Sequence, residues 1–312
     1  MRFQIVMSSK KFIARDALVE TVRAYSGLFL VLDATCLPGL PERLEAEGVP
    51  YSSLFQGQTA HELRDVAPYL VQVSPSDRLL RDFTDPTDNP RAIWPKRPGL
   101  LIACELELTA LRKHLRRFLR VEIGDQAFFF RFWEAGSARA YFAALTEPNR
   151  RKRWFLPREA GQIDAFLIPD PDRDGLCVEA MNLSEPGRTE GYRATAPFNL
   201  NDQELVALRS HRTRQELAEM VSLMRSTFPD ACTPEPERGL DYAVQRSVGR
   251  AWEFGIRQRK HAFRFAAWDL HVSGAFEAMD HAGALRKILE QPLGETEKMR
   301  RLEQRIAALE DI

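Results

Sequence analysis

Cysteine is scarce in this chain, and its few cysteines are far apart. Cys36, Cys104, Cys177 and Cys232 lie in four separate parts of the sequence, and no C-x-x-C pair occurs. A disulfide framework or a zinc ribbon needs cysteines at close spacing. We therefore expect four reduced, mostly buried thiols and a reducing cytoplasmic location.

Long hydrophobic runs are also absent. The longest stretch without a charged residue, 48–60, is largely polar, whereas a membrane-spanning helix needs about 20 apolar residues. The apolar stretch near the N-terminus is too short for the core of a signal peptide. We expect neither a membrane span nor a signal peptide.

The chain has no excess charge of either sign, since 44 basic residues balance 44 acidic ones. This balance argues against a nucleic-acid coat, a polybasic membrane binder and an acidic tail, although a local patch can still exist. Hydrophobic residues make up 44% of the sequence and include 19 Phe. A length of 312 residues suggests two domains, or one large domain with an appendage, and this composition can bury a sizeable core.

The glycine motifs of common catalytic and phosphate-binding loops are missing. The sequence contains no G-x-S-x-G, no G-x-G-x-x-G and no G-x-x-x-x-G-K-S/T. The nucleophile elbow and both familiar phosphate-binding loops depend on those glycines. We expect no catalytic residue, no cofactor and a protein that is not an enzyme.

One acidic turn leaves a metal open as an alternative. Asp170–Gly175 matches the first half of a calcium loop, D-x-D-x-D-G, but the twelfth position is Met181 where a bidentate Glu is required. A polar turn between two strands explains the same residues. We expect no metal site, with a metal-dependent hydrolase using Asp170–Asp174 as the alternative.

Apolar runs of strand length alternate with helical patterns in the first half of the chain. The expected strands are Leu28–Asp33, Tyr69–Val73, Leu100–Cys104, Val121–Ile123, Gln126–Phe132, Ile163–Ile168 and Leu176–Met181. Helical stripes follow from Asn201 onward, with a capping-box spacing at Thr213 and Glu216. The sequence predicts an α+β protein in which a mixed sheet with flanking helices precedes an all-helical lobe. The expected domains are 1–185 and 201–312, with a linker at 186–200.

A basic helix is the strongest charged feature. The apolar stripe of Leu108–Leu119 predicts a core-facing helix, and its opposite face carries Arg112, Lys113, Arg116, Arg117 and Arg120. A second basic run occurs at Arg150–Arg153. Three interpretations remain open: a solvated face, a surface for an acidic protein partner, whose carboxylates suit arginine, or a nucleic-acid surface. We take the five residues of the helix as candidate partner-binding residues.

An ordered series of short motifs runs through the first half of the chain. The motifs are Leu32-Asp33-Ala34, Pro38–Leu44, Tyr51–Gly57, Ala67–Val71, Leu111–Val121 and Phe130–Trp133. Their order and spacing resemble the Tap/Tec-type adaptor chaperones of bacterial type VI secretion. The C-terminal segments Arg250–Ile256 and Phe263–Gly274 also resemble the tail of that family. One departure is Trp133-Glu134-Ala135-Gly136, where the family usually has Tyr-Asp-Pro-Arg.

The resemblance implies a cytoplasmic, non-enzymatic adaptor. Proteins of that family bind a toxin effector in the producing cell and help to load it onto the VgrG spike. The expected partners are therefore an effector protein and a VgrG protein. A nucleic-acid-binding protein that uses the basic helix 112–120 is the alternative from another class.

Overall fold

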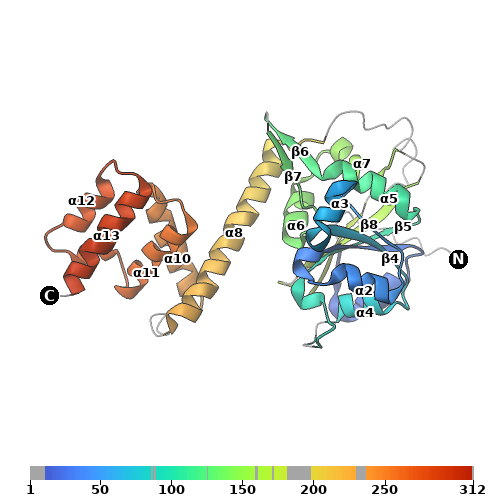
Figure 1. Ribbon diagram of the computed structural model, residues 1–312, viewed down its shortest axis with the longest axis horizontal. Coiled ribbons are helices and arrows are strands. Elements are labelled where there is room, and N and C mark those ends of the chain that lie inside the picture. Colours follow the sequence, from blue (N-terminus) through green and yellow to red (C-terminus); the bar gives the residue numbers. More distant parts are fainter. Residues whose placement is uncertain are drawn as a thin grey trace. The chain divides into compact units, whose positions relative to one another are not determined.

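The computed structural model describes residues 11–85, 87, 89–124, 126–158, 161–170, 172–180, 198–229 and 237–310 (Figure 1). The chain divides into two compact units, Met1–His211 and Arg212–Ile312. The α+β class is confirmed, since the strands lie in the first unit and the described part of the second is helical. The predicted linker at 186–200 falls mainly on residues 181–197, which lie outside the described residues.

A seven-stranded sheet with the order β1-β9-β8-β5-β2-β4-β3 forms the centre of the first unit. Its strands are β1 (Lys11–Ala14), β2 (Leu28–Asp33), β3 (Tyr51–Ser53), β4 (Pro68–Val73), β5 (Gly99–Cys104), β8 (Ile163–Asp170) and β9 (Gly175–Ala180). Each pairing between these described strands is antiparallel, so the expectation of mixed strand directions is corrected. For the β2–β4 pair the reason is the unpredicted β3, which runs in the direction of β2, so the chain returns in β4 antiparallel to β2.

The sheet is buried on both faces, which explains its continuous apolar strands. In β2 all six residues are buried. Successive side chains point to opposite faces: Phe29 and Val31 join one core, whereas Leu28, Leu30 and Leu32 join the other. We call the first the aromatic core, because most of the buried Phe and Trp side chains lie in it.

Helices cover both faces of the sheet (Figure 1). The core opposite the aromatic core includes residues of α1 (Arg15–Arg23), α2 (Leu40–Glu47) and α4 (Arg78–Thr84). The aromatic core includes residues of α5 (Leu108–Leu115), α6 (Ala135–Ala144) and α7 (Pro148–Phe155). A further short helix is α3 (Gln58–Glu62), and the 3-10 turns are η1 (Ala34–Cys36), η2 (Arg64–Val66), η3 (Trp94–Lys96) and η4 (Arg116–Phe118).

A separate two-stranded hairpin follows α5. Its strands are β6 (Arg120–Ile123) and β7 (Gln126–Phe129), and Gly124 in the turn has a φ of 58°, which favours glycine. The hairpin was expected, but β7 ends three residues before the predicted end. The predicted helix Leu108–Leu119 is also too long, because α5 stops at Leu115 and Arg120 already belongs to β6.

The second unit consists of helices around two small cores. They are the C-terminal part of α8 (Asp202–Thr227), then α10 (Glu237–Glu253), α11 (Arg259–His271), η5 (Phe276–Met279), α12 (Ala284–Glu290) and α13 (Glu295–Glu310). The capping box of α8 is not at Thr213, which lies inside the helix. Instead, the backbone N–H of Glu204 donates to the Asn201 side chain at 2.9 Å, and that of Asn201 donates to the Glu204 carboxylate at 3.0 Å.

An ion network links three elements of the second unit. Arg250 on α10 donates to Asp269 on α11 at 2.6 Å and to Glu277 in η5 at 2.5 Å. Both carboxylates are buried.

Among the described residues, no helix is long and apolar enough to cross a membrane.

Candidate functional site

The five predicted basic residues are divided among three elements. Arg112 and Lys113 lie on α5, Arg116 and Arg117 in η4, and Arg120 on β6. The prediction that all five lie on one helix face is therefore wrong, because α5 ends at Leu115, before Arg116. The structure separates four of the five residues into two pairs with different surroundings, Arg112 with Arg116 and Arg117 with Arg120, and Lys113 belongs to neither pair.

The first pair holds a neighbouring backbone segment. Arg112 donates to the carbonyl oxygens of Ser53 at 2.6 Å and Phe55 at 2.7 Å, and Arg116 donates to that of Leu54 at 3.0 Å. Burial, together with the charge of Arg116, lowers the pKa of Arg112. These two guanidinium groups therefore fasten the segment after β3 to α5, a role in the fold that the sequence did not indicate.

The second pair meets the second basic run in a pocket of about 270 Å³. Its lining residues are Arg117, Phe118, Arg120, Glu122, Arg153, Arg158 and Phe198. We call this pocket the arginine pocket. Lys113 is exposed on α5 and does not line it.

Two members of the second basic run, in contrast, serve the fold. Arg150 donates to the fully buried Glu204 at 2.5 Å and to the backbone oxygen of Asn199 at 2.6 Å. Arg151 donates to Glu179 at 2.8 Å. Of the run Arg150–Arg153, only Arg153 lines the arginine pocket.

Stacked aromatic rings form one wall of the arginine pocket. The ring of Phe118 stacks on Trp154 at 3.8 Å between centroids and meets Phe198 edge-on at 5.1 Å. His114 donates from Nε2 to the Trp154 carbonyl oxygen at 2.8 Å, and the Trp154 indole donates to the Tyr141 hydroxyl at 3.0 Å. Because this wall belongs to the close-packed aromatic core, it holds a defined shape.

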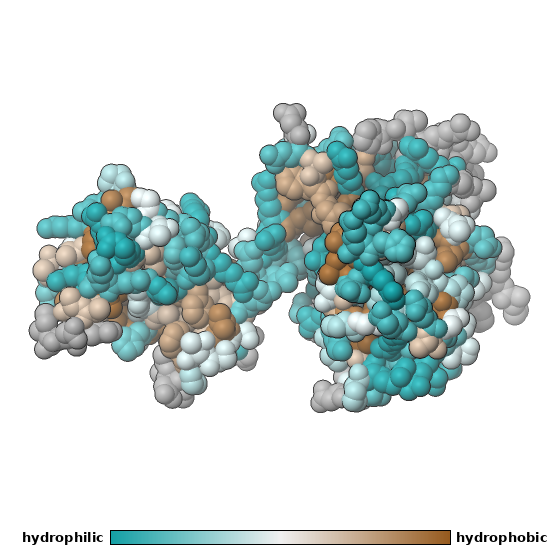
Figure 2. All heavy atoms as spheres, viewed as in Figure 1, coloured by the Kyte–Doolittle hydropathy of each residue, from teal (hydrophilic) through white to brown (hydrophobic). Residues whose placement is uncertain are grey.

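The β6–β7 hairpin exposes two aromatic side chains. Phe128 is 44% exposed and Phe129 is 51% exposed. The Phe129 ring lies 5.5 Å from that of Phe55 and 5.6 Å from that of Trp133. In Figure 2, brown residues gather at the position of this hairpin and are bordered by teal ones. Exposed aromatic side chains of this kind are candidates for contact with another protein.

A buried carboxylate fixes the base of the hairpin. Asp33, at the end of β2, accepts hydrogen bonds from the Trp133 indole at 2.7 Å and from Arg131 at 2.5 Å. It also accepts from the Thr35 hydroxyl at 2.6 Å. Burial alone would raise the pKa of Asp33, but the hydrogen bonds from Thr35 and Trp133 and the charge of Arg131 lower it overall. Asp33 is thus held as a structural anion.

The acidic turn considered for calcium is held by arginines. Asp170 is bound by Arg139 and, at 2.9 Å, by Arg173, and Asp174 pairs with Arg15 at 2.7 Å. Burial raises the pKa of Asp170, but the hydrogen bonds from Arg173 and Cys177 and the arginine charges lower it overall. Guanidinium groups occupy the positions where a cation would bind this turn. Among the described residues, no three or more His, Cys, Asp or Glu side chains come together in a way that could hold a metal ion.

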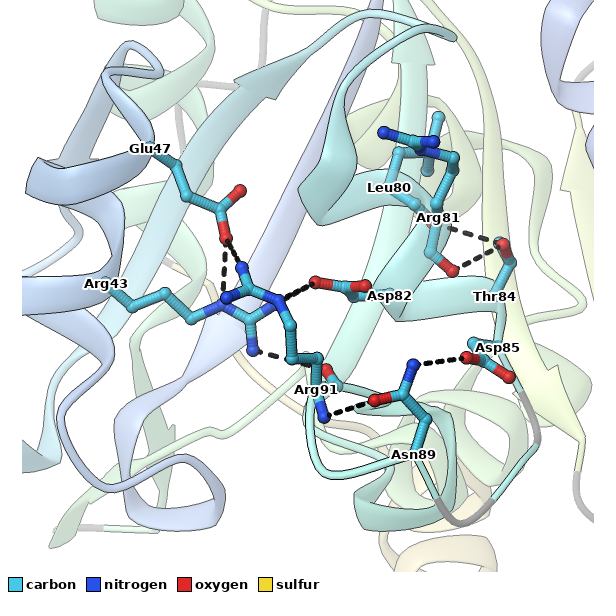
Figure 3. A network of polar contacts seen from close by, with 9 residues as sticks. All are labelled: Arg43, Glu47, Leu80, Arg81, Asp82, Thr84, Asp85, Asn89 and Arg91. Carbon is cyan, nitrogen blue, oxygen red and sulfur yellow. Dashed lines mark hydrogen bonds and ion pairs between the residues drawn. The ribbon is translucent and has the colours of Figure 1, made fainter.

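A second polar network lies across the sheet, on the side of α2 and α4 (Figure 3). Arg43 donates to Asp82 at 2.5 Å and to Glu47 at 3.1 Å, and Arg91 donates to Glu47 at 3.0 Å. Two arginines and two carboxylates thus balance each other. This pairing links α2, α4 and the segment after α4, and it leaves no unbalanced charge for a ligand.

Comparison with known proteins gives one match. Residues 28–152, from β2 to α7, match the family model described as a domain of unknown function (DUF4123). No curated protein matches the chain. No solved structure matches it either.

Sequence reasoning found only part of the arginine pocket. Arg117, Arg120 and Arg153 belong to the two basic runs, but Arg158 and Phe198 carried no local signal. Phe198 reaches the pocket because it packs in the aromatic core and its backbone oxygen accepts a hydrogen bond from the Glu122 N–H on β6. A pairing of this kind, between residues far apart in sequence, leaves no periodic trace.

Proposed function

We propose that this protein is a non-enzymatic adaptor that binds a type VI secretion effector in the cytoplasm and helps to load it onto the VgrG spike. The observation that carries the proposal is the match of residues 28–152 to the DUF4123 domain. The motifs that resemble Tap/Tec-type adaptors between Leu32 and Trp133 lie within that match. The domain and the motif series therefore support the proposal from the same residues.

The contacts between these motifs give the proposal a structural basis. Leu32-Asp33-Ala34 meets Phe130–Trp133 through the hydrogen bond from Trp133 to Asp33. Tyr51–Gly57 meets Leu111–Val121 through the bonds of Arg112 and Arg116 to backbone oxygens. Both contacts lie beside the β6–β7 hairpin, so the motifs support one surface rather than scattered positions.

The exposed aromatic side chains of the hairpin are the proposed effector-contacting residues. Phe128 and Phe129 supply apolar area, which carries most of the energy of a protein interface. Arginines at the rim of such a surface steer and orient the partner. In this mechanism the first unit holds the effector by binding alone and performs no covalent chemistry on it.

The two alternative functions have weaker support. A nucleic-acid surface needs many cations along one face, but Arg112, Arg116, Arg150 and Arg151 donate to groups of the protein itself. A hydrolase centred on Asp170 needs a metal, and the arginines around that carboxylate compete with one.

Affinity purification of the tagged protein from its native bacterium tests the proposal. Mass spectrometry of the co-purifying proteins should identify a VgrG spike protein together with a multidomain toxin. A matched purification from cells without the tag defines the background. Recovery of neither partner, from cells that express a type VI apparatus, would contradict the adaptor function.

A further inference from the structure

We propose that the outer edge of β7 binds an extended, uncharged segment of the effector, which adds to the β6–β7 hairpin as a third strand. The inference rests on the proposed adaptor function and names the form and the chemistry of the segment that the hairpin recognises. It assigns the main-chain groups of Ala127 and Phe129 to this site.

The hydrogen bonds of the hairpin show which backbone groups of β7 face outward. The N–H of Phe130 donates to the Leu119 carbonyl oxygen at 2.8 Å, so these two residues form a hydrogen-bonded pair. Hydrogen-bonded and non-hydrogen-bonded pairs alternate along an antiparallel ladder, and the register of this one runs without a shift to the turn. Phe129 and Ala127 therefore occupy the non-hydrogen-bonded positions, and their N–H and C=O groups point away from β6.

The two edges of the hairpin have different surroundings. On β6, the outward N–H of Glu122 donates to the Phe198 carbonyl oxygen at 3.4 Å, and Glu122 also forms a bridge with Asn199. In the part of the chain that the structure describes, no strand pairs with the outer side of β7. All four residues of β7 are exposed. The edge of β7 is thus the one at which a strand from another protein can add.

This edge lacks features that commonly protect an exposed strand. Lysine, proline, bulges and covering groups are among the usual protections, and β7, with the sequence Gln-Ala-Phe-Phe, has no charge, no proline and no bulge. The edge strand β3 of the large sheet shows the contrast, because Arg112 covers the Ser53 carbonyl oxygen there. An apolar edge without such protection indicates a site where strand pairing is used rather than prevented.

The side chains of β7 define the segment that fits it. Phe128 is 44% exposed and Phe129 is 51% exposed, and successive residues of a strand point to opposite faces. An added strand therefore meets one aromatic ring on each face, beside its own alternate side chains. In complexes of this kind main-chain hydrogen bonds give affinity and the alternate side chains give specificity. Since β7 carries no charge, the complementary segment is an extended run of uncharged, β-forming residues.

A second copy of this chain fits the edge less well. A strand of four residues is about 13 Å long, so two such edges paired with each other bury far less than about 800 Å² per partner, the area that a stable complex needs. An effector segment can continue beyond the edge, over Phe55, whose ring lies 5.5 Å from that of Phe129. A nucleic acid or a lipid offers no ladder of N–H and C=O groups to match β7.

Selection from a library of random peptides displayed on phage tests the inference without a known effector. The full-length protein should enrich peptides with Val, Ile, Phe or Tyr at every second position. The Ala127→Pro variant should not enrich them, because proline removes an outward N–H and leaves the bonds between β6 and β7 in place. Its matched control is Ala127→Ser, which changes the same exposed residue and keeps the N–H. Absence of enrichment by the wild type, or equal enrichment by Ala127→Pro, would overturn the proposal.

A synthetic peptide of one selected sequence tests strand pairing on the wild-type protein itself. N-methylation of one peptide bond at a time removes one N–H donor. Affinity should fall about tenfold or more at every second position, where the N–H faces β7, and change little at the positions between. Losses without this two-residue period would show that side chains alone hold the peptide, and strand addition would be wrong.

Sedimentation of the chain without peptide tests the second copy as occupant. The wild type and Ala127→Pro should have the same mass in solution. A wild-type dimer that the variant cannot form would assign the edge to a second copy and overturn the assignment to an effector segment.

The outcomes also separate this inference from the adaptor function. Peptides that bind the β7 edge with the two-residue period, with no spike or toxin recovered from cells, would leave the edge assignment standing and remove the adaptor function. Recovery of both partners by the Ala127→Pro variant at the wild-type level would do the reverse.

Discussion

The indole of Trp133 donates a hydrogen bond of 2.7 Å to the Asp33 carboxylate, across 100 residues of sequence. Both side chains are buried, so the bond joins the end of the central strand β2 to the segment between β7 and α6. Trp133 also contacts Phe129 of the exposed hairpin, 5.6 Å between ring centroids. The position of the proposed effector-contacting surface therefore depends on a contact inside the core.

Removal of the indole N–H should destabilise the first unit. In Trp133→Phe the Asp33 carboxylate loses a buried donor, which costs about 1 to 3 kcal/mol of unfolding free energy. Urea unfolding followed by circular dichroism measures the loss. A double-mutant cycle with Asp33→Asn isolates the pair: a coupling energy near zero would mean that the hydrogen bond contributes nothing.

Acid should remove the stabilisation that comes from Asp33. Hydrogen bonds and the Arg131 charge outweigh burial and hold the pKa of Asp33 below its usual value, so the folded state favours the ionised form. This contribution is fully present above the unfolded pKa of about 3.9 and is lost as the pH falls through the lower folded pKa. The difference in unfolding free energy between wild type and Asp33→Asn should therefore shrink as the pH falls below about 4. A difference that is constant or grows with acid would contradict the assignment.

Arg112 and Lys113 are neighbours on α5, and replacing them should have different effects on stability. Arg112→Met leaves the carbonyl oxygens of Ser53 and Phe55 without their donor, which should cost about 1 to 3 kcal/mol. Lys113 is exposed, so Lys113→Met should change stability by less than about 0.5 kcal/mol. Equal midpoints in thermal unfolding of the two variants would show that Arg112 does not fasten the segment after β3.

In the second unit, Arg250 should be essential for folding. Arg250→Met leaves the buried Asp269 without its cation and leaves Glu277 with Arg286 alone, at 3.4 Å. Breaking a buried ion pair in this way costs about 3 to 5 kcal/mol. The matched control is Arg300→Met on α13, whose pairing with Glu297 is on the surface, and it should unfold like the wild type. Calorimetry of both variants measures the contrast. A stable Arg250→Met protein would show that the network is replaceable.

Local patterns predicted the buried strands well, because a strand that is buried on both faces is a continuous run of apolar residues. Leu28–Asp33 is β2 residue for residue, and Leu100–Cys104 differs from β5 by one residue. Periodicity misled at α5, since Phe118 continues the helical stripe of Leu111 and Leu115 although α5 has ended at Leu115. There the chain tightens into η4 and turns into β6, and all three side chains still reach the aromatic core.

The candidate site could be predicted only in part, because it is made by tertiary contacts. Basic residues were visible in the sequence, but their roles were not. Arg112 and Arg116 bind backbone oxygens of a segment some 60 residues earlier, whereas Arg117 and Arg120 reach a pocket with Arg158. Neighbouring arginines on one short segment therefore have different roles: some bind the backbone of the protein itself, whereas others line a pocket. Their spacing in the sequence does not distinguish the two roles.

Exposed aromatics on the hairpin should decide effector capture without deciding stability. Phe128→Ser and Phe129→Ser remove apolar area that is already half exposed, so folding should change little, whereas an interface anchor of this type contributes about 2 kcal/mol or more to binding. Pull-down of the cognate effector, with thermal unfolding as the control, measures both. Full capture by the double variant would show that the effector does not bind through the hairpin.

The most direct test of the adaptor function is co-purification of the effector with the tagged spike protein, in cells that contain or lack this chain. We expect the effector on the spike only when the chain is present, with capture reduced in the Phe128→Ser/Phe129→Ser variant. Equal recovery of the effector in the absence of the chain would contradict the account.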